Sequence, residues 1–103
     1  MWVGVPYTGC KHKSEIPCTR EDEAIAFAVG VMLGGGDCSV FMQNDGLGNS
    51  VNIIATLLQP YEIKVPLEIY VRHTPEHHAY MGYITKDLMK LLGYEGSNKT
   101  NNG

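Results

Sequence analysis

The chain has 103 residues, of which 44% are hydrophobic, so it is large enough to bury one core but not two. Its formal net charge of -3 and its scattered lysines and arginines provide no basic patch for a phosphate backbone, so nucleic acid is not an expected partner. The longest apolar stretch, residues 24–33, is far shorter than the ~20 residues that cross a bilayer. We therefore expect one soluble, cytoplasmic domain that does not bind a membrane.

Three cysteines, Cys10, Cys18 and Cys38, are present without a CxxC spacing. An odd number of cysteines without that spacing argues against a disulfide framework and against a zinc knuckle. We expect reduced thiols.

The first half of the chain predicts a strand, a loop and a helix. Residues 2–5 form a short apolar run that stops at Pro6, and residues 7–17 lack any period. Thr19 is suited to cap the following helix, with Asp22 three residues later, and Gly34 to Gly36 favour its end. The inward face of this helix carries apolar residues at helical spacing: Ile25, Ala28, Val29, Met32 and Leu33.

The second half predicts two further strand–helix pairs. Residues 39–42 indicate a buried strand, residues 43–49 a loop, and residues 51–58 a helix that ends at Pro60. Residues 65–71 indicate another strand and residues 72–78 another loop. Thr85 is suited to cap a last helix, and residues 96–103 have no apolar residue and are expected to form a disordered tail after a domain of residues 1–95. The expected inward residues of that helix are Leu88, Leu91 and Leu92.

This alternation of strands and helices predicts an α/β fold, a three-layer αβα sandwich with a mainly parallel sheet and right-handed crossovers. In such sheets, ligands bind beyond the carboxyl ends of the strands. Residues 43–49 and 72–78 would both lie at that edge.

An acidic residue, Glu21, opens the first helix, and small residues follow it, with Ala28 at +7 and Gly30 at +9. This spacing resembles the pyrimidine-binding domains of thiamine diphosphate (ThDP) enzymes. The resemblance implies that Glu21 contacts N1' of the aminopyrimidine ring and favours the tautomer that activates the cofactor. The alternative is a solvated first-turn acid that stabilises the helix, as we interpret Asp22 and Glu23.

A second segment, residues 41–52, reads FMQNDGLGNSVN. Its glycines permit a tight turn with exposed amides at a helix N-terminus, a ready anion site, although an ordinary glycine turn with Asn49 as a helix cap is the alternative. The segment closely resembles the MQNSGLGNxxN stretch of sulfopyruvate and phosphonopyruvate decarboxylase α-type domains. Asp45 departs from that pattern, where the family has Ser. The resemblance implies cofactor contacts from Glu21, Gln43, Asn44, Gly46, Gly48 and Asn49.

A third segment, residues 75–92, resembles the C-terminal loop and helix of that family, with His78 four residues before Gly82. The implied substrate contacts are Asn44, Asn49, Arg72 and His78. The alternatives are a solvated loop histidine and a metal site of His73, His77 and His78. No cysteine or acid pair nearby has ligand spacing, so we expect no metal on this chain.

Two departures from the family pattern concern the domain as a whole. No helix precedes the first strand, and the link from Pro6 to Thr19 is too short for the usual helix, so the fold is expected to be shortened at its N-terminal side with one sheet face exposed. No GDG motif with a downstream Asn pair is present. Diphosphate and Mg2+ would therefore be held by a diphosphate-binding (β-type) partner subunit in a homo- or hetero-oligomer.

The resemblance thus implies a subunit of a ThDP-dependent 2-oxoacid decarboxylase that releases CO2 from a small substrate such as sulfopyruvate or phosphonopyruvate. One alternative is a non-catalytic interaction or regulatory domain of the same ancestry. Another is a flavodoxin-like module that binds an anion or a nucleotide with residues 46–52.

Overall fold

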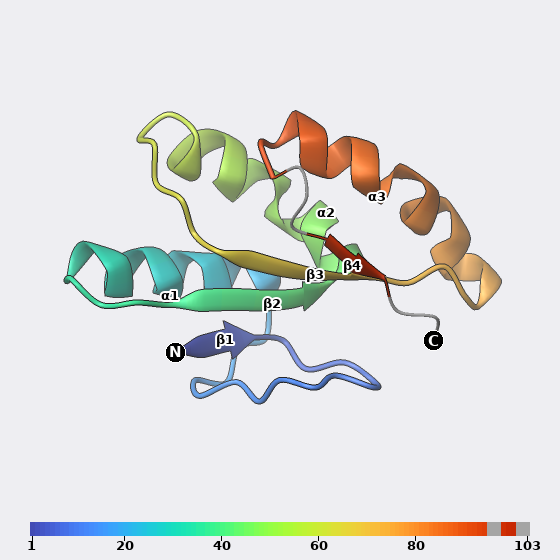
Figure 1. Ribbon diagram of the computed structural model, residues 1–103, viewed down its shortest axis with the longest axis horizontal. Helices are drawn as coiled ribbons and strands as arrows, with labels where there is room; N and C mark the ends of the chain where they lie inside the picture. Colours follow the sequence, from blue (N-terminus) through green and yellow to red (C-terminus); the bar gives the residue numbers. More distant parts are fainter. Residues whose placement is uncertain (95–97, 101–103) are drawn as a thin grey trace.

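The computed structural model describes residues 1–94 and 98–100. Its elements follow each other in the order shown in Figure 1. They are β1 (Trp2–Gly4), α1 (Glu21–Leu33), β2 (Ser39–Gln43), α2 (Asn44–Ile53), the π-helical segment η1 (Ile54–Leu58), β3 (Leu67–Val71), the 3-10 segment η2 (Glu76–His78), α3 (Ala79–Leu91) and β4 (Asn98–Thr100).

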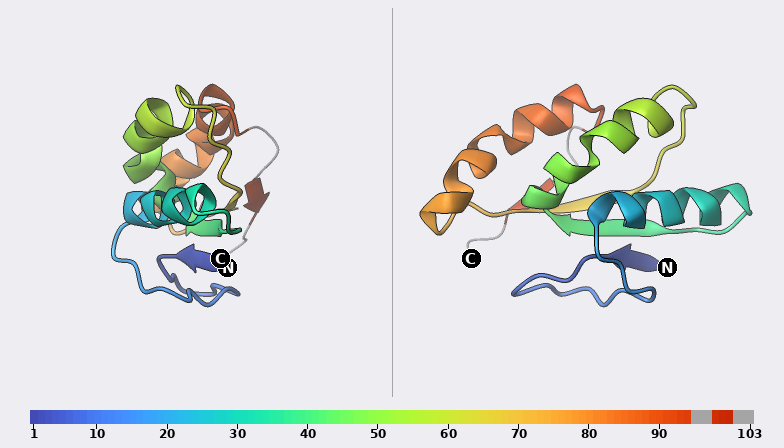
Figure 2. Two further views of the ribbon diagram at one scale, coloured as in Figure 1. Left: turned by 90° about the vertical axis from the view of Figure 1, so that its left-hand side faces the viewer. Right: turned by 180° about the vertical axis from the view of Figure 1, so that it is seen from behind.

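The strands form one four-stranded sheet in the order β1-β2-β3-β4, with each neighbouring pair parallel. The predicted α/β class with a parallel sheet is confirmed. Because the strand order follows the chain order, right-handed crossovers place successive helices on the same face, and α1, α2 and α3 lie on one side of the sheet (Figure 2). In the described residues the other face carries no helix, so this part of the chain has two layers, and the third layer of the predicted αβα sandwich is not seen in it.

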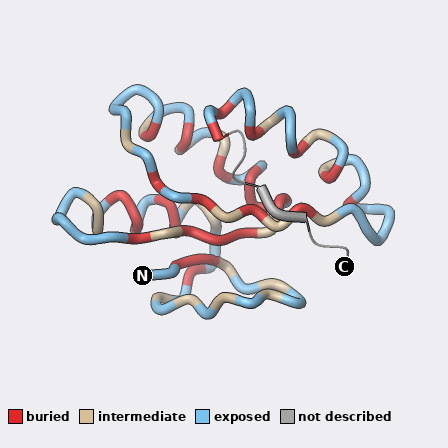
Figure 3. Tube along the Cα trace, viewed as in Figure 1, coloured by how far each residue is buried: buried red, intermediate tan, exposed pale blue. Residues whose placement is uncertain are grey.

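The core lies between these helices and the sheet (Figure 3). Alternation along β3 buries Leu67, Ile69 and Val71 and leaves Glu68 and Tyr70 half-buried on the opposite face. Small residues on the inner side of α1 allow α1 to pack closely against the sheet and α2. The core residues that carry this packing include Ala24, Ile25, Ala28, Val40, Met42, Leu47 and Ile54.

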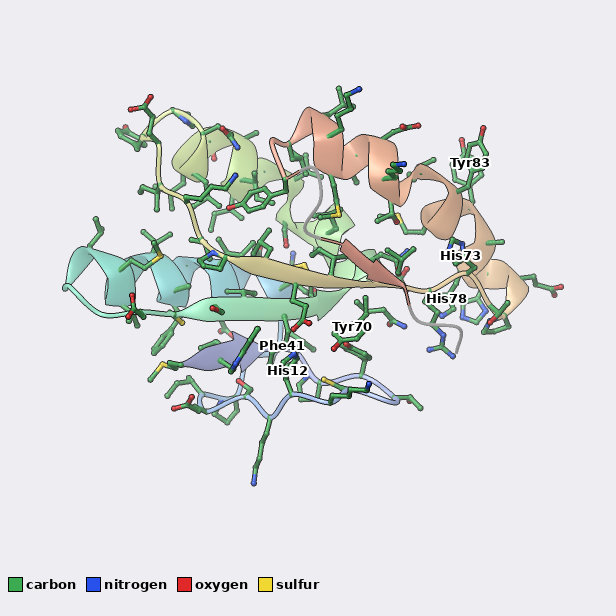
Figure 4. All side chains as sticks on the ribbon, viewed as in Figure 1. His12, Phe41, Tyr70, His73, His78 and Tyr83 are labelled. Carbon is green, nitrogen blue, oxygen red and sulfur yellow. The ribbon has the colours of Figure 1, made fainter. Side chains whose placement is uncertain are left out.

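The segment of residues 5–18 packs on the helix-free face of the sheet. Its His12 ring stacks on Trp2, with centroids 4.0 Å apart, and lies 5.2 Å from the Phe41 ring (Figure 4). Tyr7, in the same segment, packs against Tyr70, with ring centroids 5.4 Å apart. An aromatic layer from a loop therefore covers part of the face that lacks helices.

The prediction that Thr19 caps the first helix was wrong. The N-cap is Arg20, which makes no side-chain cap hydrogen bond, and its guanidinium instead pairs with Asp22. The Thr19 amide donates to the Glu23 carboxylate at 2.9 Å. The predicted helix end is confirmed, since α1 stops at Gly34 and Gly35 takes the left-handed conformation with φ +92.

The prediction of a loop over residues 43–49 was also wrong, because α2 begins at Asn44 directly after β2. Thr85 is not a cap either, since α3 already begins at Ala79 and Thr85 is buried in its middle. Gly82, Thr85 and Met89 are the buried residues of α3, whereas Leu91, which was expected to face inward, is 84% exposed and Leu88 is half-buried. Of the other leucines, Leu92 is buried as expected.

The expected disordered tail lies mostly outside the described residues. The part that is described, Asn98–Thr100, pairs with β3 as β4. In the described part of the chain, no helix combines the length and the apolar character needed to cross a membrane.

Candidate functional site

The N-termini of α1 and α2 meet near the carboxyl end of β2. Glu21 stands in the first turn of α1, and Asn49 of α2 donates from Nδ2 to its Oε1 at 3.2 Å. Gly46, one turn before Asn49, lies directly against the same carboxyl, because a Cβ built on Gly46 would stand 2.2 Å from Glu21 Cγ. The structure therefore brings together three predicted site residues, Glu21, Gly46 and Asn49.

Asn44 joins the ends of two strands to α3. Its Oδ1 accepts from the Arg72 amide at 3.1 Å, and its Nδ2 donates to the Arg72 carbonyl at 3.3 Å and to Thr85 Oγ1 at 2.9 Å. The Asn44 side chain is fully buried. It fixes the relative position of the two loops at the sheet edge, and its amide faces the interior.

His78 is buried at the start of α3, and its Nδ1 lies 3.0 Å from Oδ2 of Asp45 in the first turn of α2. This nitrogen has no aligned hydrogen bond, so the close approach to Asp45 is an electrostatic contact that is attractive when the imidazole is protonated. Asp45 itself is exposed. Asp45, which departs from the family pattern, thus contacts His78, the predicted substrate-binding histidine. The sequence did not predict this contact.

The remaining predicted residues line the same edge less directly. Gln43 is half-buried at the end of β2. Gly48 lies on a more open side of α2, where an added Cβ would meet nothing closer than Met81 Cε at 3.9 Å. The Arg72 Nε donates to the Thr74 carbonyl at 2.7 Å, so its guanidinium lies over its own loop. In Figure 4, His73 and His78 lie together on the segment that follows β3.

The first turn of α1 carries three acidic residues, Glu21, Asp22 and Glu23. The Arg20 guanidinium beside Asp22 holds the pKa of that carboxyl below its usual value. An open groove of about 430 Å³ runs between α1 and α2 next to the Glu21–Asn49 contact. Its lining includes Arg20, Asp22, Glu23, Asn49, Asn52 and Thr56.

The alternative of a histidine metal site gains no support from the geometry. Within residues 1–94, no three side chains of the His, Cys, Asp and Glu types are grouped closely enough to hold a metal ion. His77 and His78 do pack on each other, with ring centroids 4.1 Å apart, but no third ligand joins them in this part of the chain.

Sequence comparisons identify relatives of this chain, although no family model matches it. The sulfopyruvate decarboxylase subunit alpha of Methanococcus maripaludis is 44% identical over 88 residues, which cover 80% of this chain and 52% of the relative. The protein of the same name from Methanothermobacter thermautotrophicus is 37% identical over 81 residues, 75% of this chain and 49% of the relative. The resemblance to these decarboxylases is confirmed.

Phosphonopyruvate decarboxylase of Streptomyces viridochromogenes is similar as well, at 39% identity over 87 residues, 77% of this chain and 21% of the relative. The chain therefore spans about half the length of the two α subunits and about a fifth of the phosphonopyruvate decarboxylase. The activities for which these relatives are named belong to the longer proteins.

Proposed function

We propose that this chain supplies the aminopyrimidine-binding part of a ThDP-dependent 2-oxoacid decarboxylase, with Glu21 as the acid that contacts N1' of the cofactor. The observation that carries the proposal is the fixed carboxyl of Glu21, which lies against Gly46 and accepts a hydrogen bond from Asn49. The similarity to decarboxylases over 75–80% of the chain supports the same conclusion.

The residues present fit an aminopyrimidine ring. Glu21 is half-buried in a helix first turn, so its carboxyl can reach a ligand and can share a proton with a ring nitrogen. The half-buried Gln43 at the end of β2 and the amides at the N-terminus of α2 add hydrogen-bonding groups at the same edge of the sheet. When bound, ThDP supplies the electron sink for the loss of CO2 from a 2-oxoacid.

The other predicted cofactor residues act differently in this proposal. Gly46 and Gly48 keep α2 free of side chains where the carboxyl or the cofactor approaches. Asn44 contributes indirectly, because its buried amide holds the ends of β2 and β3 together. Glu21 therefore makes the direct proton contact.

The substrate in this proposal is a small 2-oxoacid with a second anionic group, of the sulfopyruvate or phosphonopyruvate type named for the relatives. Arg72 and His78 supply the cationic and hydrogen-bonding groups beyond the end of β3. Asp45 Oδ2 lies 3.0 Å from His78 Nδ1 and holds the imidazole at this edge of the sheet.

Diphosphate and Mg2+ would be held by a β-type partner subunit, so that the active site forms between two chains. The designation subunit alpha of the relatives implies a partner for those proteins. A shared site also suits a chain whose sequence lacks the diphosphate-binding motif.

The proposal is tested by co-expressing the chain with a diphosphate-binding subunit and measuring CO2 release from sulfopyruvate and phosphonopyruvate. CO2 release that requires ThDP, Mg2+ and both chains is the expected result. No release, together with a melting temperature that ThDP does not change, would favour the non-catalytic alternative. Saturable nucleotide binding by this chain alone, unchanged in Glu21→Gln, would favour the flavodoxin-like alternative.

A further inference from the structure

We infer that Asn49 is a positioning residue that acts on the reaction through Glu21 and makes no contact with the substrate itself. This inference rests on the proposed function and assigns a more specific role to one of its residues. It starts from the geometry of one face of α2, because Gly46 and Asn49 are three residues apart and both meet the Glu21 side chain.

The backbone of Gly46 limits the space available to the Glu21 carboxyl. A Cβ at this position would lie 2.2 Å from Cγ and 2.6 Å from Cδ of Glu21, so the acid is packed against the backbone of α2. This backbone prevents the Glu21 side chain from moving closer to α2. Most remaining freedom of the carboxyl is rotation about its last bonds.

Asn49 restricts that rotation. Its Nδ2 donates to Oε1 at 3.2 Å, and it is the side-chain donor that this carboxyl receives in the described part of the chain. Oε2 lies beside Gly46, 2.9 Å from the position of a Cβ built there, and in this inference it is the oxygen that meets a ring nitrogen of the cofactor. A carboxyl fixed in this way starts the reaction in the geometry it needs, which raises kcat.

Neighbouring charges make such a donor useful. Asp22 and Glu23 share the first turn of α1 with Glu21, and the guanidinium of Arg20 is committed to Asp22. The neutral amide of Asn49 orients the Glu21 carboxyl without adding a cation that would compete with the proton shared between this carboxyl and N1' of the cofactor. A lysine or arginine in its place would not have this property.

The first test is the division of the effect of Asn49→Ala between kcat and KM in the complex with the partner subunit. We expect kcat to fall about tenfold, with the substrate KM changed by less than about twofold. Lys86→Ala, at an exposed position of α3 outside the candidate site, is the control and should leave both unchanged. A raised KM with an unchanged kcat would show a direct substrate contact and would overturn the inference.

The second test exchanges the two polar groups. Asn49→Asp places two carboxylates side by side and should lower the melting temperature of the chain, while the double variant Glu21→Gln with Asn49→Asp restores a donor–acceptor pair and should recover it. Activity should stay lost in the double variant, because the carboxyl is then on α2. If the double variant is no more stable than Asn49→Asp alone, the contact does not exist and the inference fails.

The two tests separate this inference from the function on which it rests. A wild-type complex without ThDP-dependent CO2 release would overturn the proposed function, and the positioning role with it, even if the stability cycle shows the contact. An active wild-type complex in which Asn49→Ala is equally active would overturn the positioning role alone.

Discussion

His12, on the segment between β1 and α1, pairs through its Nε2 with Oε2 of Glu68 on β3. The pair is largely shielded from solvent, and His12 stacks on Trp2 at the same time. Because Glu68 lies two strands away from β1, this contact ties residues 5–18 across the helix-free face of the sheet.

Replacing His12 by alanine should release this segment from the sheet. We expect His12→Ala to lower the free energy of unfolding by about 1–2 kcal/mol, from the lost ring packing and the lost charge-assisted hydrogen bond. Urea denaturation measures the change. Lys13→Ala, an exposed neighbour on the same segment, is the control, and equal effects of the two variants would contradict the role of His12.

The two glycines of α2 should respond in opposite directions to substitution by alanine. Gly48→Ala meets only an ordinary van der Waals contact, with Met81 Cε at 3.9 Å, and should stabilise the chain by about 0.5–1 kcal/mol, because alanine favours the helix. Gly46→Ala would collide with Glu21, so it should destabilise the chain and abolish ThDP-dependent activity. The melting temperatures of both variants test this prediction. A higher melting temperature for Gly46→Ala would show that Glu21 is not packed against Gly46.

Asn44 should be important for stability. Asn44→Ala removes three hydrogen bonds and leaves buried partners on Arg72 and Thr85, so we expect a loss of about 2–3 kcal/mol in chemical denaturation. The exposed Asn52 provides the control, with a change below about 0.5 kcal/mol for Asn52→Ala. A similarly small effect at Asn44 would argue that its amide faces a ligand instead.

Alkaline pH should destabilise the chain. Burial raises the pKa values of Cys18, Cys38, Tyr7 and Tyr94 above their ordinary values. The folded state then retains protons that the unfolded state releases above pH ~8.5 for cysteine and ~10 for tyrosine, so stability falls as pH rises through this range. Urea denaturation at pH 7, 9 and 10 should show a steady decrease, and a constant stability would contradict the burial of these groups.

Much of the fold follows from the sequence pattern. The buried run before Gln43 and the helical spacing of Ile25, Ala28 and Val29 are local signals, and they predicted β2 and α1 to within about two residues. Parallel order then placed residues 43–49 and 72–78 at one edge, as the contacts of Asn44 with Arg72 confirm. The edge of the sheet that carries the candidate site was therefore predictable.

Other features depend on tertiary contacts that a local pattern does not contain. Two glycines after a strand suggest a turn, and the close approach of the Glu21 side chain to Gly46 in the first turn of α2 is a contact that the local pattern does not contain. The hydrogen bond between Asn44 and Thr85 likewise joins two segments far apart in the sequence, α2 and α3. The contact of Asp45 with His78 is also between distant segments, so the sequence could indicate both residues but not their contact.

ThDP-dependent CO2 release by Glu21→Gln, in complex with a diphosphate-binding subunit, tests the role of Glu21 as the acid that contacts the cofactor. We expect kcat to fall about 100-fold or more, because the amide cannot share a proton with the cofactor ring, while Glu23→Gln in the same turn remains active. A Glu21→Gln complex as active as the wild type would show that Glu21 does not have this role.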